Sequence, residues 1–451
     1  MNGIKEKIVR LHEQKHVKKY GFSLKKGEEG DMLVAKSSLH CDCRGGKLKC
    51  GVGYSTYLRN NAAITYRNEN AREIFIAKTL GADGVSYTEG FFVAEESGML
   101  YAYDSSTKTF KMKTTCGDNS HFCSAIDSDK KVVNAIGAKG KLALMDDQLV
   151  VASTGLKGTG AVCFYRHRLF CGVQPNLLYY SAPNDWTNFE ESIDDGGWVN
   201  FGHDYGAIVS LIVFQDQLYV FFERAIFRLQ ETGSARYFAP EQIPYRGGVI
   251  FGRTVGVCGN AVFFLTKDGI YRFDGTEVKF INTGITINEE YAQKKFGCAG
   301  YNGKMCIRYY DKNNEGKTIV IYEDGKSWYF TEEMRGLSQA DGRAMALNNT
   351  MLAFLDDNGV LPIDKQYYFN DCETDFGTTK RKRVTKIRFI GEGTFDFTLR
   401  NRGRIIEKTL TFKDGYAEFD LQERGDKFGV DIRLYQGAKV HEMAVEYYTL
   451  K

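Results

Sequence analysis

Short apolar runs separated by polar turns dominate the chain from about Met32 onward. In one unit, the apolar run Gln217–Phe222 leads through a tight turn into a second strand, Ala225–Leu229. The same order of strands and turns recurs, and one apolar anchor position repeats at intervals of 44, 49 and 40 residues, at Phe227, Tyr271, Val320 and Val360. Four short strands in each 40 to 50 residues or so are typical of the blades of a β-propeller.

Repeats of this kind predict a β-propeller over residues 31–377. A four-stranded blade cannot bury both of its faces alone, so it must stack on neighbours around a ring. Two ordinary β-sandwiches are the alternative, but sandwiches rarely keep such a period over about 270 residues. We expect six or seven blades, because Gly140–Ser153 is either a blade of its own or part of the next one. The repeats are Phe91–Met112, Gly140–Ser153, Val162–Ser181, Ile208–Leu229, Val255–Phe280, Gly297–Phe330 and Ala344–Ile363.

Strict alternation of apolar and polar residues replaces this pattern near the C-terminus. Val430, Ile432 and Leu434 point one way along an extended strand, and Asp431 and Arg433 point the other. About six such strands, joined by turns that contain glycine, predict a small antiparallel β-sandwich over residues 378–451.

The N-terminal residues 1–30 predict a short basic arm, with eight Lys or Arg against two Glu in the first 26 residues. Ile4, Ile8 and Leu11 share one face if residues 5–19 are helical. Two interpretations stay open. The arm either meets nucleic acid or an acidic partner subunit, or it is an amphipathic helix packed on its own domain.

Composition excludes several classes of protein. With 31 Phe and 27 Tyr in 451 residues, the chain has far too many apolar rings to be disordered throughout. Its formal net charge of +3 argues against a surface that binds nucleic acid all round. We expect no transmembrane helix and no signal peptide, because no long apolar run and no apolar stretch behind the N-terminal charges is present. The eleven cysteines are then expected to be reduced thiols.

Two segments carry residues that could bind a metal ion. Three cysteines and a histidine within eleven residues offer the sulfur and nitrogen ligands of zinc, but their spacing fits none of the usual sites: His40, Cys41, Cys43 and Cys50. Asp311–Gly316 resembles half of a calcium loop, but Tyr322 stands where the loop needs a bidentate glutamate. We favour reduced strand cysteines for the first segment and a polar hairpin turn for the second.

No catalytic constellation is visible in the sequence. Paired carboxylates such as Asp194 with Asp195, or Asp356 with Asp357, lie in turn-like polar clusters and single out no acid–base pair. No nucleophile motif, phosphate loop or dinucleotide fingerprint occurs. We therefore expect a protein that is not an enzyme and that holds no cofactor and no metal.

One segment resembles a known family. Cys163–Cys171, Asn176–Ser181 and Ala182–Phe189 are similar to the "His-Arg-Leu-Phe … Tyr-Tyr-Ser … Pro-x-Asp-x-Thr-Asn-Phe/Trp" blade of bacteriophage virion proteins with a β-propeller. That group includes packaged-DNA stabilisation or tail-hub proteins of short-tailed phages and tail nozzle proteins. The continuation through Ile208–Val220 and Ala225–Leu229 is similar too, as is the sandwich after the last blade. The basic arm and the cysteine-rich entry strand have no match there.

The resemblance implies a structural component of a bacteriophage virion. It would be a ring-forming tail hub or nozzle, or a head–tail connector, present in several copies, six by resemblance, and assembled in the bacterial cytoplasm. Its partners would be other tail, portal or adaptor proteins, and it would help to retain or conduct DNA during ejection. Non-specific DNA contacts or interfaces are then expected at the clustered cations Lys380, Arg381, Lys382, Arg383, Lys15, Lys18 and Lys19. A solvated linker is the alternative for the first four.

A carbohydrate- or receptor-binding propeller at the tail tip is the second hypothesis. Tyr179, Tyr180 and Trp186 could stack on sugars, although packing between blades is the interpretation that we favour for these rings. A propeller glycosidase is the third hypothesis, and no pair of carboxylates can be nominated for it.

Overall fold

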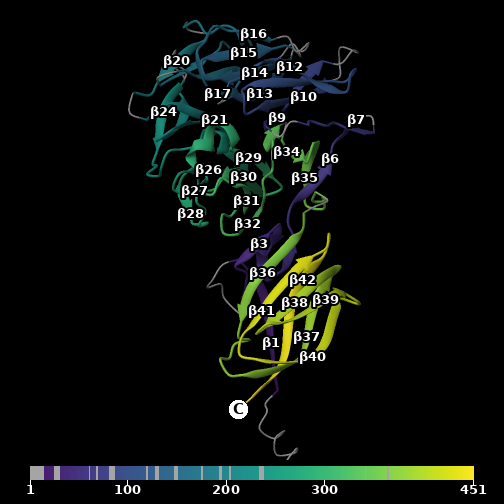
Figure 1. Cartoon of the computed structure of the whole chain (residues 1–451). Coiled ribbons are helices and arrows are strands. Elements are labelled where there is room, and N and C mark those ends of the chain that lie inside the picture. The colour runs from purple at the N-terminus through teal and green to yellow at the C-terminus, as the bar shows by residue number, and fades with distance from the viewer. Residues whose placement is uncertain are drawn as a thin grey trace, which may run out of the picture. The chain divides into compact units, whose positions relative to one another are not determined.

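The computed structural model describes residues 15–24, 31–59, 61–67, 70–80, 87–117, 120–126, 132–146, 151–173, 176–191, 196–202, 205–232, 238–340, 342–362 and 365–450. The chain forms two compact units. Unit 1 comprises Met1–Ser55, Ser327–Glu332 and Asp356–Lys451, and unit 2 comprises Thr56–Lys326 and Glu333–Leu355. Figure 1 colours the chain from its N-terminus to its C-terminus.

Seven four-stranded sheets occur within the described residues, and neighbouring strands run antiparallel wherever their register is defined. The first four are formed by β9 (Ala71–Leu80), β10 (Tyr87–Glu95), β11 (Met99–Asp104) and β12 (Thr109–Thr115); β13 (His121–Ile126), β14 (Val132–Ala138), β15 (Lys141–Met145) and β16 (Val151–Ser153); β17 (Gly158–Tyr165), β18 (Arg168–Val173), β19 (Leu177–Tyr180) and β20 (Gly197–Asn200); and β21 (Ile208–Phe214), β22 (Gln217–Phe222), β23 (Ile226–Glu231) and β24 (Phe238–Ile243). The other three are formed by β25 (Gly256–Cys258), β26 (Ala261–Thr266), β27 (Gly269–Phe273) and β28 (Val278–Ile281); β29 (Gly297–Tyr301), β30 (Lys304–Tyr310), β31 (Gly316–Tyr322) and β32 (Trp328–Glu332); and β33 (Ser338–Ala340), β34 (Arg343–Asn348), β35 (Met351–Asp356) and β6 (Gly53–Thr56).

These sheets form a closed ring. The first strand of each sheet contacts the first strand of the next, from β9 through β13, β17, β21, β25 and β29 to β33. Strand β33 in turn contacts β9. The protein therefore contains a β-propeller, as the sequence predicted, and it has seven blades in the described residues because β13–β16 form a blade of their own.

Burial explains why the blade strands appear as apolar runs. Every residue of β26 is buried, and so is every residue of β22 except Gln217. A blade stacks on a neighbour at each face, so both sides of its second strand are covered. Three of the anchor positions, Phe227, Tyr271 and Val320, lie in third strands, whereas Val360 lies beyond the end of β35. The fourth anchor position of the repeat was therefore misplaced.

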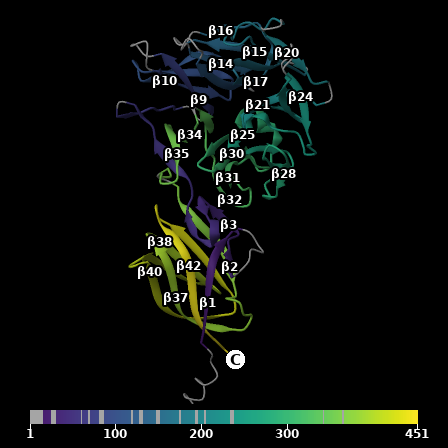
Figure 2. The same cartoon turned by 180° about the vertical axis from the view of Figure 1, so that it is seen from behind.

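Unit 1 contains a β-sandwich of two sheets around one apolar core. One sheet has the strand order β2-β1-β42-β37-β40, with β5 added to β42 and β4 to β5, and the other has the order β3-β36-β41-β38-β39 (Figures 1 and 2). The strands are β1 (Lys15–Ser23), β2 (Met32–Val34), β3 (Ser37–Leu39), β4 (Cys41–Asp42), β5 (Leu48–Cys50), β36 (Tyr367–Thr374), β37 (Lys382–Glu392), β38 (Thr394–Asn401), β39 (Arg404–Thr411), β40 (Tyr416–Gly425), β41 (Phe428–Leu434) and β42 (Lys439–Thr449).

The N-terminal part of the sandwich corrects the sequence interpretation. Residues 15–19 form part of strand β1, not of a helix, while residues 1–14 lie outside the described residues. Tyr20 and Phe22 point into the sandwich core, and β1 pairs with β42. For residues 15–19 this tertiary pairing outweighs the predicted helix. Ile4, Ile8 and Leu11 lie outside the described residues. The division into residues 1–30, 31–377 and 378–451 therefore differs from the two units, because strands from both ends of the chain build the sandwich.

Helical structure is confined to short turns in the described residues. They are η1 (Arg44–Gly46), η2 (Gly252–Thr254), η3 (Glu289–Tyr291) and α2 (Ala292–Lys295), and a two-stranded hairpin is formed by β7 (Leu58–Arg59) and β8 (Ala62–Ala63). In this part of the chain, no helix has the length and apolar character needed to span a bilayer.

Candidate functional site

The predicted cluster Lys380–Arg383 enters the sandwich at the start of β37 and divides there. Lys380 and Arg381 are exposed just before the strand. Lys382 is fully buried, and its Nζ donates a hydrogen bond to the backbone oxygen of Asp426 at 2.6 Å. Burial lowers the pKa of Lys382 below its ordinary value. Arg383 is half-buried on the outer face, with its guanidinium 5.3 Å from the ring centroid of Tyr448. Lys382 is thus a structural residue, and the other three reach the surface.

The predicted lysines of β1 each lie beside a carboxylate. The Nζ atoms of Lys15, Lys18 and Lys19 lie 2.8, 2.8 and 3.0 Å from carboxylate oxygens of Glu446, Asp31 and Glu442, respectively. A hydrogen bond to Glu446 raises the pKa of Lys15. Because side chains alternate along a strand, Lys15 and Lys19 share the outer face of the sheet, and Lys18 faces the other way.

Strand pairing brings Lys15 and Arg383 into one row across the sheet. Lys15 of β1 and Arg383 of β37 both stand opposite Tyr448 of β42, and Arg383 also stands opposite Arg424 of β40. Figure 2 shows β1, β42, β37 and β40 within the same sheet. We call Lys15, Tyr448, Arg383 and Arg424 the basic row.

Arg381 lies next to this row, because its backbone oxygen accepts a hydrogen bond from Leu450 N at 2.7 Å. Arg381 is two residues before Arg383, so the two arginines point to the same side of the extended chain. Sequence reasoning missed Arg424 and Tyr448. The alternation in Tyr416–Gly425 could have placed Arg424 on an outer face, but the register that aligns it with Arg383 is visible only in the fold.

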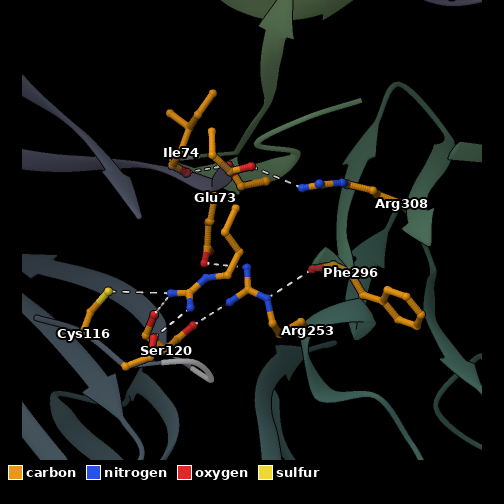
Figure 3. A network of polar contacts seen from close by, with 11 residues as sticks. Glu73, Ile74, Cys116, Ser120, Arg253, Phe296 and Arg308 are labelled. Carbon is orange, nitrogen blue, oxygen red and sulfur yellow. Dashed lines mark hydrogen bonds and ion pairs between the residues drawn. The ribbon is translucent and has the colours of Figure 1, made fainter. Parts of the chain in front are cut away.

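The centre of the propeller is a second polar site. A cavity of about 340 Å³ there is lined by residues of the first strands of all seven blades. Arg253 of η2 uses three of its nitrogens there: Nη2 contacts Glu73 Oε2 at 2.9 Å, Nη1 donates to Ser120 O at 2.9 Å, and Nε donates to Phe296 O at 3.1 Å (Figure 3). The side chain is 5% exposed, so Arg253 holds blade segments together instead of offering its charge to solvent.

Two further buried arginines join blades around this centre, and Figure 3 labels one of them, Arg308. Arg72 donates to Gly117 O at 2.8 Å and contacts Ser120 and Cys116. Arg308 donates from Nε to Glu333 Oε1 at 2.7 Å and from Nη1 to the backbone oxygen of Ala71 at 3.3 Å. The network therefore spans the ring.

The titratable groups at this cavity are poorly suited to acid–base or nucleophilic catalysis. Burial, with Arg253 and Arg72 nearby, lowers the pKa of His121 to about 3, so its imidazole is neutral at neutral pH. Burial raises the pKa of Cys298 to about 12, which keeps its thiol protonated and a weak nucleophile. The carboxylate of Glu73 is engaged by Arg253.

The candidate metal and carboxylate segments form ordinary structural elements. In the described part of the chain, no group of three or more His, Cys, Asp or Glu is placed to hold a metal ion. Cys41 stands opposite Cys50 in the β4–β5 pair, and the described cysteines are free thiols. Asp311 accepts hydrogen bonds from the backbone nitrogens of Asn313 and Glu315 at 2.9 and 3.0 Å, which makes a hairpin turn.

The carboxylate pairs do not form an acid–base site either. Asp194 and Asp195 lie outside the described residues. Asp356 caps a turn at the end of β35, where its Oδ1 accepts a hydrogen bond from Asn358 N at 2.9 Å.

Rings proposed to stack on sugars lie mainly in the propeller core. Tyr180 and Trp186 are 6% exposed each, and Tyr179 is half-buried. Trp186 packs edge-on against Phe164 with ring centroids 5.0 Å apart. The segment that resembles phage proteins therefore supplies packing between blades, and Tyr180 and Trp186 have little surface to offer a sugar.

Two hollows lie on the five-stranded sheet of the sandwich. One, of about 520 Å³, is lined by polar residues such as Tyr368, Asp396 and Arg433. The other, of about 810 Å³, contains three arginines, but each contacts a carboxylate within 3.0 Å: Arg400 contacts Asp431, Arg402 contacts Asp426 and Arg404 contacts Glu423. The arginines of this hollow are thus compensated by carboxylates.

No protein-family model matches the chain, and no curated protein matches its sequence. Solved structures with some likeness include virginiamycin B lyase from Staphylococcus aureus, at 13% identity and a TM-score of 0.42, covering 65% of this chain and 98% of the lyase. BBS1N in a complex with ARL6DN matches at 12% identity and a TM-score of 0.43, covering 69% of this chain and 98% of that one. The RRP9 WD40 repeats match at 10% identity and a TM-score of 0.37, covering 64% of this chain and 99% of that one. The propeller assignment rests on the strand order and the closure of the ring.

Proposed function

We propose that this protein is a structural, non-enzymatic component of a bacteriophage virion. It would act as a ring-forming tail hub or nozzle, or as a head–tail connector, that stacks on other tail proteins and helps to retain or conduct DNA. The observation that carries the proposal is the segment over residues 163–229, which resembles the blade of phage virion propellers and makes up most of two consecutive blades, β17–β20 and β21–β24.

Features of the propeller support a scaffold role. The ring is closed, and its centre is tied across by Arg253 to segments of three other blades. Such a ring keeps its shape under load and presents loops at its edges for contacts with other subunits. Copies of one subunit close into a larger ring when a head-to-tail interface repeats with the right rotation.

Features of the sandwich support contact with a charged partner. Its seven-stranded sheet carries the basic row at one end. The propeller then serves as the rigid body and the sandwich as the surface that meets a polyanion or a neighbouring subunit.

Immunogold electron microscopy tests the proposal. An antibody against the purified chain is applied to particles released by the host that carries the gene, and the same antibody absorbed with purified chain is the control. Label at the neck or tail that disappears in the control is the expected result. Intact, DNA-filled particles without label at any position would contradict the proposal if the antibody also fails to label the same particles after their disruption with detergent.

A further inference from the structure

Two cysteines face each other on the short strands β4 and β5 of the sandwich. Cys41 of β4 stands directly opposite Cys50 of β5, and Asp42 stands opposite Lys49. The ion pair between Lys49 Nζ and Asp42 Oδ2, at 3.0 Å, agrees with this register. Among the registers defined for the described residues, no other places one cysteine opposite another.

The hydrogen bonding around this pair brings the two side chains close together. Gly51 N donates to His40 O at 2.7 Å, so Cys41 and Cys50 occupy the adjacent non-hydrogen-bonded position of the strand pair. Opposite Cα atoms at such a position lie about 4.5 Å apart, which is within the range that a disulfide spans. Both side chains pack against the sandwich core, where Cys41 is fully buried and Cys50 is partly buried.

We propose that Cys41 and Cys50 are a site of covalent modification, at which a cross-strand disulfide forms when the protein meets a peroxide. The strand register and the hydrogen bond at Gly51 carry this inference. It goes beyond the proposed function and does not depend on it.

The reaction begins at Cys50, because its side chain is the more accessible of the two. The Cys50 sulfur attacks one oxygen of hydrogen peroxide and the O–O bond breaks. A sulfenic acid forms, and the leaving hydroxide takes the Cys50 proton to give water. The Cys41 sulfur then attacks the Cys50 sulfur and the S–O bond breaks, and the hydroxide leaves with the Cys41 proton as a second water. Two thiols are oxidised and one peroxide is reduced.

The surroundings of the two thiols make the first step slow. Burial raises the pKa of Cys50 to about 11, so its thiol is protonated at neutral pH. Burial, with the neighbouring thiols Cys43 and Cys50, also raises the pKa of Cys41. Because the thiolate is the nucleophile, we expect the link to form over minutes to hours. Once the sulfenic acid exists, the strand pairing holds Cys41 against it, which favours the disulfide over further oxidation of Cys50.

The disulfide would fasten a weakly paired edge of the seven-stranded sheet. In the described residues, β4 pairs with β5 alone, and β5 pairs with β42 through Lys49 opposite Lys439 and Leu48 opposite Val440. A disulfide stabilises a fold mainly by restricting the unfolded chain. The oxidised sandwich should therefore melt at a higher temperature than the reduced one.

Peptide mapping of the full chain without reductant tests this inference. The purified, reduced chain is treated with hydrogen peroxide, its remaining thiols are blocked with iodoacetamide, and it is digested with trypsin. We expect residues 37–44, through Cys41, linked to residues 50–59, through Cys50, as the dominant disulfide. Its mass should lie about 2 Da below the sum of the two peptides, because two hydrogens leave. The melting temperature of the sandwich should rise by about 5 °C and return after treatment with dithiothreitol.

Two variants and one internal control sharpen the test. Cys50→Ser should abolish the linked peptide and the melting shift, whereas Cys43→Ser should keep both, because Cys43 lies beyond the end of β4. Cys123 and Cys163 are the internal control, since they are close enough for Cys163 to raise the pKa of Cys123 but do not stand opposite each other. Circular dichroism checks that the variants remain folded, and the map of the unmodified chain tests the pair without them. An oxidised chain without a disulfide at Cys50, a link through Cys43, or an equal yield of a Cys123–Cys163 link would overturn the inference.

Discussion

The propeller and the sandwich are both built of antiparallel strands, but they bury those strands differently. In the propeller, a second strand such as β26 is buried at every residue, because blades stack on both of its faces. In the sandwich, β38 alternates between buried and half-exposed residues, because only one face meets the core. The sandwich can therefore place charged side chains along a whole sheet face, and the propeller has to place its charges at its centre and edges. This difference explains why the basic row lies in the sandwich and the buried Arg253 network in the propeller.

The largest effects are expected from removing one core ring in each region. Phe264→Ala in the propeller and Phe389→Ala in the sandwich each delete a fully buried ring, which costs about 3–5 kcal/mol. Because each unit has its own core, each variant should lower the stability of its own unit. Hydrogen exchange with peptide resolution measures both units at once. If either variant lowers the stability of both units equally, the two units share one cooperative core, which would contradict the separate cores described here.

A somewhat smaller effect is expected from Arg253→Ala. The change leaves the partly buried Glu73 and two buried carbonyl oxygens without the guanidinium, which costs about 3 kcal/mol. Calorimetry should show the loss in the propeller transition. Arg228→Ala is the matched control, because its pair with Glu241 is partly exposed and its removal should cost less than about 1 kcal/mol. Equal losses in the two variants would contradict the bracing role of Arg253.

Acid should destabilise the sandwich unit through His40, as it should destabilise the propeller through the buried His121. Burial, aided by Lys365, lowers the pKa of His40 to about 4, below the ordinary 6.5. A depressed pKa gives stability that is complete above about pH 6.5 and is lost as the pH falls toward 4. His40→Asn should therefore flatten the stability of the sandwich between pH 7 and 4.5 by an amount of order 2 kcal/mol.

Asparagine tolerates the left-handed backbone at His40, where φ is 59°. The control is His167→Asn, an exposed propeller residue with φ of 60°. Urea unfolding at several pH values gives both profiles. A sandwich profile that keeps its slope in His40→Asn would refute the role of this histidine.

The smallest effect is a gain in stability at a propeller hairpin. Gln215 and Asp216, between β21 and β22, have φ of 49° and 56°, a conformation that costs a residue with a side chain about 1–2 kcal/mol. Gln215→Asn with Asp216→Gly supplies the residues that this turn prefers and should stabilise the propeller by about 1 kcal/mol. The sandwich hairpin at Arg402–Gly403 already has glycine, so the same exchange there, Arg402→Asn, should change stability less. Thermal melts of the two variants show which of the two hairpins gains more stability.

The parts of the fold that were predictable are those with local patterns. Apolar runs such as Gln217–Phe222 revealed the blades, and the alternation of Val430, Ile432 and Leu434 revealed the sandwich. Strand β1 was missed because lysines occupy both of its faces, Lys18 on one and Lys15 and Lys19 on the other, which hides the alternation.

The sites depend on contacts between distant parts of the sequence. The basic row needs strands from both ends of the chain on either side of Tyr448, a register that no local pattern contains. The three contacts of Arg253 reach residues 43, 133 and 180 positions away. The charge of Lys380–Arg383 was visible in the sequence, but the burial of Lys382 depends on the fold.

Quantitative mass spectrometry of purified, DNA-filled particles tests the central proposal most directly. Isotope-labelled peptides of this chain and of the portal protein give the number of copies per particle. We predict a fixed ratio to the portal, with six copies per particle by the family resemblance, that survives nuclease and high-salt washing of the particles. Particles that package DNA and infect normally but contain no peptide of this chain would contradict the structural role.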